Sequence, residues 1–308
     1  MNDSEAPTPA GEAYQETQPV PEQMDAASTM SPSLETCILF LKNPNGILGT
    51  ALLLIILLLT IFGPGLYGVD PFEISGAPFT PPGDADAFFG TDYLGRDILA
   101  GILIGGRATL IVGTVAAAIT ISIGLIVGAI SGYFGGAVDT VLMKVTEFFQ
   151  VLPALLFAMV LVTIYSPSMT TVALGIGVVS WTSVARLTRA EFIRLREREY
   201  VKSVIAAGGK TRYIMLRTIL PNSLPPIIVA SAFAIGSAIL FEGGLSFLGL
   251  GDPNNMSWGL IIGQNKIYTL DAWWTVTIPG IAIFLAVLSI CLIGDGLNDA
   301  LNPQLRKR

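Results

Sequence analysis

Histidine is absent from this 308-residue chain, and charged residues make up only 13% of it. Without histidine the chain lacks the side chain that most often serves as a general base or a metal ligand. Histidine-based catalytic centres and metal sites are therefore excluded. Soluble domains carry about 25% charged residues. The shortage of charge, together with 52% hydrophobic residues, predicts an integral membrane protein.

Cysteine is scarce as well. Cys37 and Cys291 lie far apart and form no CxxC pair, so the sequence suggests neither a zinc site nor a disulfide framework. We predict two free thiols, no metal site and no covalent chemistry, so that the chain is not expected to be an enzyme.

Basic residues are missing from residues 1–36, which hold seven acidic residues. The rest of the chain is nearly balanced, with 17 basic and 16 acidic residues. The amino-terminal stretch is also rich in Pro, Ser, Thr and Gln, a composition that buries no core, and residues 1–41 are predicted to be a disordered acidic tail. It lacks the basic start and early apolar run of a secretory signal peptide.

Long apolar runs dominate what is present. A helix crosses the bilayer core, roughly 30 Å thick, in about 20 apolar residues. Six segments qualify, namely 46–66, 108–131, 138–165, 167–185, 218–241 and 273–294. We therefore predict an all-α membrane fold with a first transmembrane helix at 42–68, an extracytoplasmic loop at 69–106, five further spans within 107–303 and a basic tail at 304–308.

Glycine and proline residues predict close packing and hinges in these helices. Gly124, Gly128 and Gly132 recur every four residues, a doubled GxxxG pattern that predicts close helix packing, although chance in a glycine-rich helix would also give it. Pro153 in the third span and Pro221 at the start of the fifth are predicted to be structural hinges.

Three polar features have more than one interpretation. Lys144 and Glu147 are three residues apart, which favours a local ion pair at the membrane edge. Glu242, near the outer end of the fifth span, either lines a water-filled path or reaches the outer interface. In the outer loop, Thr91 or Asp92 is predicted to cap a short helix, in a segment that could equally take part in binding.

The distribution of Lys and Arg predicts the orientation. With six spans and a cytoplasmic amino terminus, thirteen basic residues fall in cytoplasmic segments and three in outer ones. Both termini are then cytoplasmic. Trp258, Trp273 and Trp274 fall in or beside the last outer loop, as in an interfacial aromatic belt.

The longest charged stretch, residues 196–222, belongs to the cytoplasmic loop predicted at 190–217. Val201, Val204, Ile205 and Gly208 share one face of a predicted helix, which Gly208-Gly209 should end. A second helix should start near residue 210 and carry Ile214, Leu216 and Ile219 toward the membrane. Spacing alone also allows an amphipathic hairpin lying on anionic lipid.

One motif in this stretch resembles a nucleotide site without meeting its requirements. Gly208–Thr211 reads GGKT, but a phosphate-binding loop needs a glycine at position 204, which is Val204, and a preceding strand. The chain is therefore predicted to bind no cofactor, and any ATP must be hydrolysed by another polypeptide.

Seven blocks in order resemble the shorter permease subunit of ABC transporters of the dipeptide, oligopeptide and nickel type. They are FGTDYLGRDIL (89–99), GYFGGAVD (132–139), LREREYV (195–201), ILPN (219–222), LSFLGLG (245–251), SWG (257–259) and GDGLNDALNP (294–303). The resemblance covers about residues 42–303. It implies the ABC importer permease fold, with six transmembrane helices and a cytoplasmic coupling helix, in the plasma (inner) membrane.

The resemblance also implies partners and a docking site. The partners would be a second permease, two ATP-binding ATPase subunits, an extracytoplasmic substrate-binding protein and membrane lipid, with no nucleic acid. The ATPase-docking residues would be Glu199, Tyr200, Lys202, Ser203, Val204, Ile205, Ala206, Ala207, Gly208 and Gly209. The family's Glu-Ala-Ala falls on Lys202-Ser203-Val204 and matches at none of the three positions, so docking must use a different charge pattern.

The implied mechanism is ATP-driven import by alternating access, with di- or oligopeptides as the substrate. Nickel complexes and oligosaccharides remain alternatives for the same permease. A secondary transporter driven by an ion gradient is the alternative of another class. It predicts charged residues in mid-membrane and inverted repeats, which the sequence does not clearly show. A membrane scaffold, a third class, would need no glycine-broken hairpin.

Overall fold

A computed structural model describes residues 32–84 and 87–301 of the chain. These residues form helices and no strand beyond three isolated bridges. The elements are α1 (Pro32–Lys42), α2 (Pro44–Tyr67), α3 (Ile98–Phe134), α4 (Gly136–Val151), α5 (Ala154–Tyr165), α6 (Met169–Arg196), α7 (Glu199–Ala206), α8 (Thr211–Tyr213), the π-helix η1 (Ile214–Ile219), α9 (Leu220–Phe247), α10 (Trp258–Asn265), the 3₁₀-helix η2 (Lys266–Tyr268) and α11 (Trp274–Leu301).

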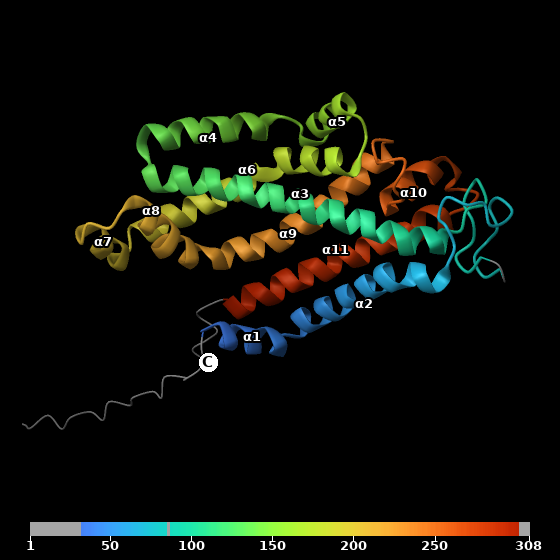
Figure 1. Ribbon diagram of the computed structural model, residues 1–308, viewed down its shortest axis with the longest axis horizontal. Coiled ribbons are helices and arrows are strands. Elements are labelled where there is room, and N and C mark those ends of the chain that lie inside the picture. The colour runs from blue at the N-terminus through green and yellow to red at the C-terminus, as the bar shows by residue number, and fades with distance from the viewer. Residues whose placement is uncertain (1–31, 85–86, 302–308) are drawn as a thin grey trace, which may run out of the picture.

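Five long helices, α2, α3, α6, α9 and α11, run side by side along the length of the molecule (Figure 1). Helices α7 and α8 lie at one end of this bundle, and α10 with the loop after α2 lies at the other. We call these the α7 end and the α10 end. The five long spans, one of them α9 extended back to Thr211, have the length and apolar composition needed to cross a membrane. The predicted all-α membrane fold is thus confirmed.

The predicted third span is broken rather than merely kinked. Helices α4 and α5 meet at an angle of 86° where Leu152 and Pro153 interrupt the helix, and they count as a sixth span only if the bent pair is taken as one. Proline cannot donate the backbone hydrogen bond that would continue α4. Pro153 instead stands at the N-cap of α5.

The glycine face of α3 packs against α6, as predicted. A Cβ atom on Gly124 would lie 2.6 Å from Val184 Cβ, and one on Gly132 would lie 2.8 Å from Phe192 Cβ. Gly177 on α6 makes the reciprocal approach to Ile119. Backbones this close require glycine on one side of each contact. The α3–α6 pair is therefore a rigid centre on which the other helices pack.

Helix α3 begins at Ile98, so the predicted loop at 69–106 was wrong at its end. The capping prediction was wrong too, because Asp97 caps this helix by accepting the Ala100 N–H at 2.9 Å. Residues 99–106 are apolar and glycine-rich, and the glycines concealed the helix in the sequence. They are where α3 meets α10: a Cβ on Gly101 would lie 2.9 Å from Ile261 Cδ1.

Helix α2 contains a proline that leaves a carbonyl without its usual donor. Pro64 has no N–H to offer the carbonyl of Thr60, four residues earlier. Arg107 of α3 supplies the donor instead, with Nε 3.1 Å from the Thr60 oxygen and Nη2 3.0 Å from the Ile61 oxygen. The Arg107 guanidinium thus completes the backbone hydrogen bonding of α2, so it is not free to bind a substrate.

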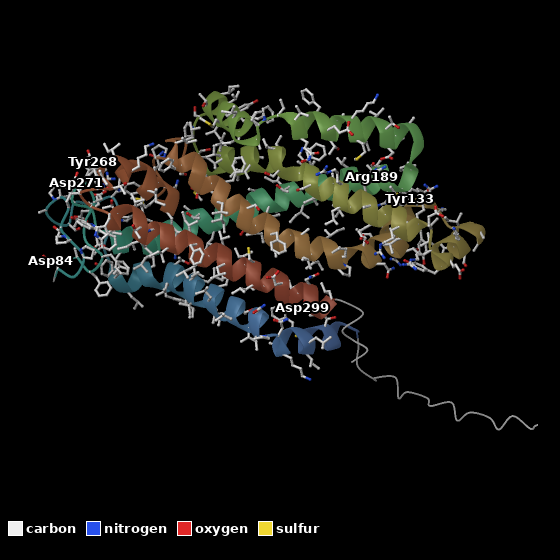
Figure 2. The ribbon with its side chains drawn as sticks, turned by 180° about the vertical axis from the view of Figure 1, so that it is seen from behind. Asp84, Tyr133, Arg189, Tyr268, Asp271 and Asp299 are labelled. Atoms are coloured by element: carbon white, nitrogen blue, oxygen red, sulfur yellow. The ribbon has the colours of Figure 1, made fainter. Side chains whose placement is uncertain are left out.

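The tail prediction needs a boundary correction. Residues 32–42, most of which were assigned to a disordered tail of residues 1–41, form α1. Asn43 follows it and donates a hydrogen bond of 2.7 Å to Asp299 near the end of α11, a residue labelled in Figure 2. The acidic part of the tail at 1–31 and the basic tail at 304–308 lie outside the described residues.

Two side-chain predictions were wrong. Among the described residues, the ion pairs do not include Lys144 with Glu147; the acid that α4 uses is Asp139, which pairs with Arg189 of α6. The second wrong prediction was the interfacial aromatic belt of Trp258, Trp273 and Trp274. Trp258 and Trp274 are buried, and their indole nitrogens donate to backbone oxygens of Ile102 and Thr91, respectively. Only Trp273 is exposed, as a belt residue would be.

Candidate functional site

Residues 197–213 at the α7 end form a short hairpin, which we call the α7 hairpin. Helix α7 ends in a Schellman motif, since Gly209 N–H donates to the Val204 oxygen and Gly208 N–H to the Ile205 oxygen, each at 3.0 Å. Gly208 holds the left-handed conformation this motif requires, with φ +78°. The predicted end of the helix at Gly208-Gly209 is confirmed. Helix α6 continues to Arg196, so the hairpin is shorter than the predicted loop at 190–217.

A small apolar cluster attaches the hairpin to the bundle. Val201 is fully buried among Phe192 and Leu195 of α6 and Ile214 and Ile219 of η1. Val204 packs against the edge of the same cluster. Val201 therefore makes the main contact between the hairpin and the bundle, and Val204 adds a smaller one.

The predicted apolar face extends too far. Ile205 was placed on the buried stripe with Val201, but it is 45% exposed. The helix ends one residue later, and the chain turns back so that Gly209 covers Val204: a Cβ on Gly209 would lie 2.8 Å from Val204 Cγ1. Within residues 32–84 and 87–301, no element covers Ile205. Of the residues predicted to be carried toward the membrane, Ile214 and Ile219 are buried and Leu216 is exposed on η1.

The three residues at the Glu-Ala-Ala positions make contacts within the hairpin. Lys202 Nζ lies 3.0 Å from Glu197 Oε2, and this ion pair lowers the pKa of Glu197. Ser203 donates to the Glu199 carbonyl oxygen at 2.9 Å. The positive charge at position 202 is therefore balanced by an acid five residues earlier, and it does not stand alone on the surface.

The structure leaves most of the predicted docking residues exposed. Tyr200 is 43% exposed, close to the value for Ile205. The exposed members of the predicted set are Glu199, Tyr200, Lys202, Ser203, Ile205, Ala206, Ala207 and Gly208, whereas Val204 and Gly209 are partly covered. We call these exposed members the hairpin face. It includes two large apolar side chains, Tyr200 and Ile205, among charged, polar and small residues.

The other predicted hinge, Pro221, lies directly after the π-helix η1 in a helix that then continues as α9. Proline at 221 removes an N–H and crowds the carbonyl of the preceding turn, which accounts for a wider helical turn here. Asn222 adds a side-chain hydrogen bond at this turn, because its amide donates to the Thr218 oxygen at 2.7 Å. The hairpin is thus continuous with α9 through a segment of non-standard pitch.

An ion pair that sequence reasoning missed ties α4 to α6 near the hairpin. Arg189 donates from Nε and Nη2 to the two carboxylate oxygens of Asp139 at 2.5 and 2.6 Å, and Ser131 of α3 donates to the same carboxylate. Figure 2 labels Arg189 on α6 on the side that faces α4. The signal in the sequence was an acid in the first turn of α4 and an arginine beside the α3–α6 glycine face, 50 residues away.

Helices α6 and α9 border two cavities of about 340 Å³ each, one nearer mid-bundle and one at the α7 end. The mid-bundle cavity is lined by hydroxyls of Thr120, Ser180, Ser183 and Ser237 together with Phe233 and Phe241. The second is lined by Arg194, Asn222 and Asn298 among apolar residues. Volumes of this size suit small ligands. Sequence reasoning named none of these residues, because isolated serines on apolar helices carry no recognisable pattern.

Residues 124–307 match the family model described as the binding-protein-dependent transport system inner membrane component. The matched range includes the α7 hairpin, α6 and α9. The chain belongs to this family of transport permeases. It is a membrane permease component, and no group of three or more metal-binding side chains occurs among the described residues.

Curated relatives agree over nearly the whole permease. The dipeptide transport system permease protein DppC of Haemophilus influenzae is 37% identical over 284 residues, covering 90% of this chain and 96% of that protein. The di/tripeptide transport system permease protein DppC of Pseudomonas aeruginosa is 35% identical, with coverage of 90% and 93%. The dipeptide permease DppC of Alkalihalophilus pseudofirmus is 36% identical, with 94% of each chain covered. The sequence resemblance to peptide-type permeases is thereby confirmed.

Proposed function

We propose that this permease is a subunit of an ATP-driven importer of di- or oligopeptides that works by alternating access. The names of its relatives, which are permeases of dipeptide and peptide transport systems, support this substrate class. In this proposal the chain pairs with a second permease, two ATPase subunits and a substrate-binding protein. It binds no cofactor itself, and ATP is hydrolysed on the partner subunits.

The hairpin face is the observation that carries the ATPase-docking part of the proposal. Tyr200 and Ile205 are large apolar side chains that the described part of the chain leaves exposed, on a helix anchored by the buried Val201. Aromatic and apolar anchors surrounded by polar residues are typical of protein interfaces. The α7 end is then the cytoplasmic end, and both termini are cytoplasmic, as the Lys and Arg distribution favours.

The coupling follows from how the hairpin is joined to the spans. Motion of the hairpin face is transmitted through Val201 to α6 and through η1 to α9, the two helices that border the cavities. Serine hydroxyls in the mid-bundle cavity offer donors and acceptors to peptide bonds, and Asn298 in the second cavity offers an amide, whereas Arg194 of that cavity is already paired with Glu191. A hinge-like shift of α6 against α9 would open the mid-bundle cavity to one side of the membrane at a time.

The test is uptake by the full complex in proteoliposomes. We expect the chain, co-expressed with its partner subunits, to import a labelled dipeptide only when ATP and the binding protein are present. Excess unlabelled peptide should compete, whereas a nickel chelate or a maltooligosaccharide should not. Uptake driven by an ion gradient without ATP would contradict the ABC mechanism, and competition by the chelate or sugar alone would contradict the peptide assignment.

A further inference from the structure

Glu242 is a buried acid at the α10 end. It lies on the last turns of α9 and is only 3% exposed. Its Oε1 accepts hydrogen bonds from Ser246 at 2.7 Å and from Ser257 at 2.9 Å. The Thr109 hydroxyl of α3 also approaches the carboxyl. Oε2 has no hydrogen-bond partner among the described residues.

Glu242 belongs to the wall of a very small cavity. This cavity, of about 10 Å³, is lined by Glu242, Ser257, Asp252 and Asn255 together with apolar residues of α3 and α6. A space of that size holds about one water molecule.

Among the described residues no ion pair includes Glu242, and Lys266 of η2, beside the end of α9, donates to the Phe247 oxygen at 2.7 Å. Helix α10 and the rest of α9 carry no charged residue, and the described charges of α11 lie at its far end. On α3 the nearby Arg107 is used by the carbonyls of α2. The 248–257 segment contributes Asp252, whose hydrogen bonds from Asn254, Asn255 and Met169 outweigh burial and lower its pKa.

These neighbours favour the neutral form of Glu242. An ionised carboxylate without a counter-charge is costly to bury, and the negative charge of Asp252 on the same cavity raises that cost. Neutral hydroxyl donors on Oε1 do not replace a cation. A proton on Oε2 makes the carboxyl neutral. The cavity has room for one water molecule, to which the protonated oxygen can donate a hydrogen bond.

Glu242 also lies where α10 is held to the bundle. Its partner Ser257 is the N-cap of α10 and accepts the Leu260 N–H at 3.1 Å. Trp258 N–H donates to Thr109 at 3.2 Å. The backbones touch here as well, because a Cβ on Gly259 would lie 2.8 Å from Gly243 Cα. Separation of α10 from α9 would therefore expose Glu242 to water.

We propose that Glu242 is a proton-binding site that controls how tightly α10 is held against α9 and α3. The neutral acid packs against Ser257 and keeps the α10 end closed. Loss of the proton favours the opened arrangement, in which water solvates the carboxylate. A proton bound more tightly in one conformation shifts the equilibrium toward that conformation. This proposal does not depend on the transported substrate.

The test is hydrogen–deuterium exchange of the α10 amides in the full-length chain, reconstituted with its partners in lipid nanodiscs. Rates are corrected for the intrinsic pH dependence of exchange. In the wild type we expect exchange of residues 258–265 to speed up with rising pH, by at most about tenfold per pH unit, as one proton is released. Glu242→Gln, which resembles the neutral acid, should remain slow at every pH.

The matched control is Asp252→Asn, which removes the other carboxyl of the cavity and should shift the pH dependence to lower pH without abolishing it. A flat corrected profile in the wild type would overturn the proposal, whatever the variants do. So would a pH dependence that persists unchanged in Glu242→Gln. Slowing of wild-type exchange by sodium or calcium at fixed pH would assign the site to a metal ion and reject the proton.

Discussion

The two ends of the bundle differ in how completely the chain satisfies its own side chains. At the α10 end, two buried carboxylates are paired within the described chain: Asp97 accepts from Tyr67 at 2.7 Å and caps α3, and Asp92 accepts from the N–H groups of Leu94 and Arg96 at 2.8 Å each. Burial raises the pKa of Asp92, and these donors oppose the shift. At the α7 end, Tyr200 and Ile205 are left exposed by the part of the chain that the structure describes.

The difference shows which contacts stabilise each end of the bundle. At the α10 end, aromatic contacts such as the stacked Tyr93 and Tyr268 rings, 5.5 Å apart, hold the loop to η2; Figure 2 labels Tyr268 at this end. At the α7 end, the buried Val201 anchors the hairpin, while Tyr200 and Ile205 stay exposed. The buried contacts of the α10 end stabilise the fold, and the exposed residues of the α7 hairpin are where we propose that the ATPase subunits bind.

The largest contrast is expected between two aromatic residues, one at each end. Trp258 is 1% exposed and its indole donates to the Ile102 oxygen at 2.9 Å, so Trp258→Ala should lower the stability of the chain by about 3–5 kcal/mol. Tyr200→Ala removes an exposed ring and should change the stability of the isolated chain by no more than about 0.5 kcal/mol. Thermal unfolding of both variants in the same detergent measures this. Equal losses would end the distinction between the ends.

The smallest effect is expected at the exposed pair Glu197 and Lys202. Lys202 lowers the pKa of Glu197, so the stabilisation is present above the unfolded glutamate pKa of about 4.3 and is lost as the pH falls through the lower folded value. Lys202→Ala should therefore differ slightly from the wild type at pH 7 and low salt, and not at all at pH 3. Lys202→Glu places like charges together and should unfold more readily than Lys202→Ala at pH 7. A difference that grows on acidification would contradict the assigned pair.

Much of this fold could be predicted, and the failures have identifiable causes. Apolar runs located the spans, and Gly208-Gly209 located the end of α7. Helix ends were harder: the glycines of 99–106 read as loop although they pack against α10, and the charged last turns of α6 read as part of the cytoplasmic loop. In each case tertiary packing overrode the local composition.

The site was only partly visible in the sequence. The exposure of Ile205 depends on α7 ending after two turns, which periodicity does not report. The environment of Glu242 depends on Ser257, 15 residues away across the α9–α10 turn, and on α3. Contacts of this kind between distant segments have no local pattern, so the sequence left Glu242 with two open interpretations and suggested neither that it is buried nor that one of its oxygens is unpaired.

The most direct test of the account is whether the hairpin face binds the ATPase subunits. Ile205→Glu places a charge on this face, and Leu270→Glu places the same charge on a residue that is 98% exposed at the α10 end. Both variants should unfold at the wild-type temperature. We predict that Ile205→Glu weakens co-purification of the ATPase subunits by about tenfold or more, as loss of an interface anchor does, and that Leu270→Glu leaves it unchanged. Wild-type co-purification with Ile205→Glu would contradict the assignment of the hairpin face as the docking site.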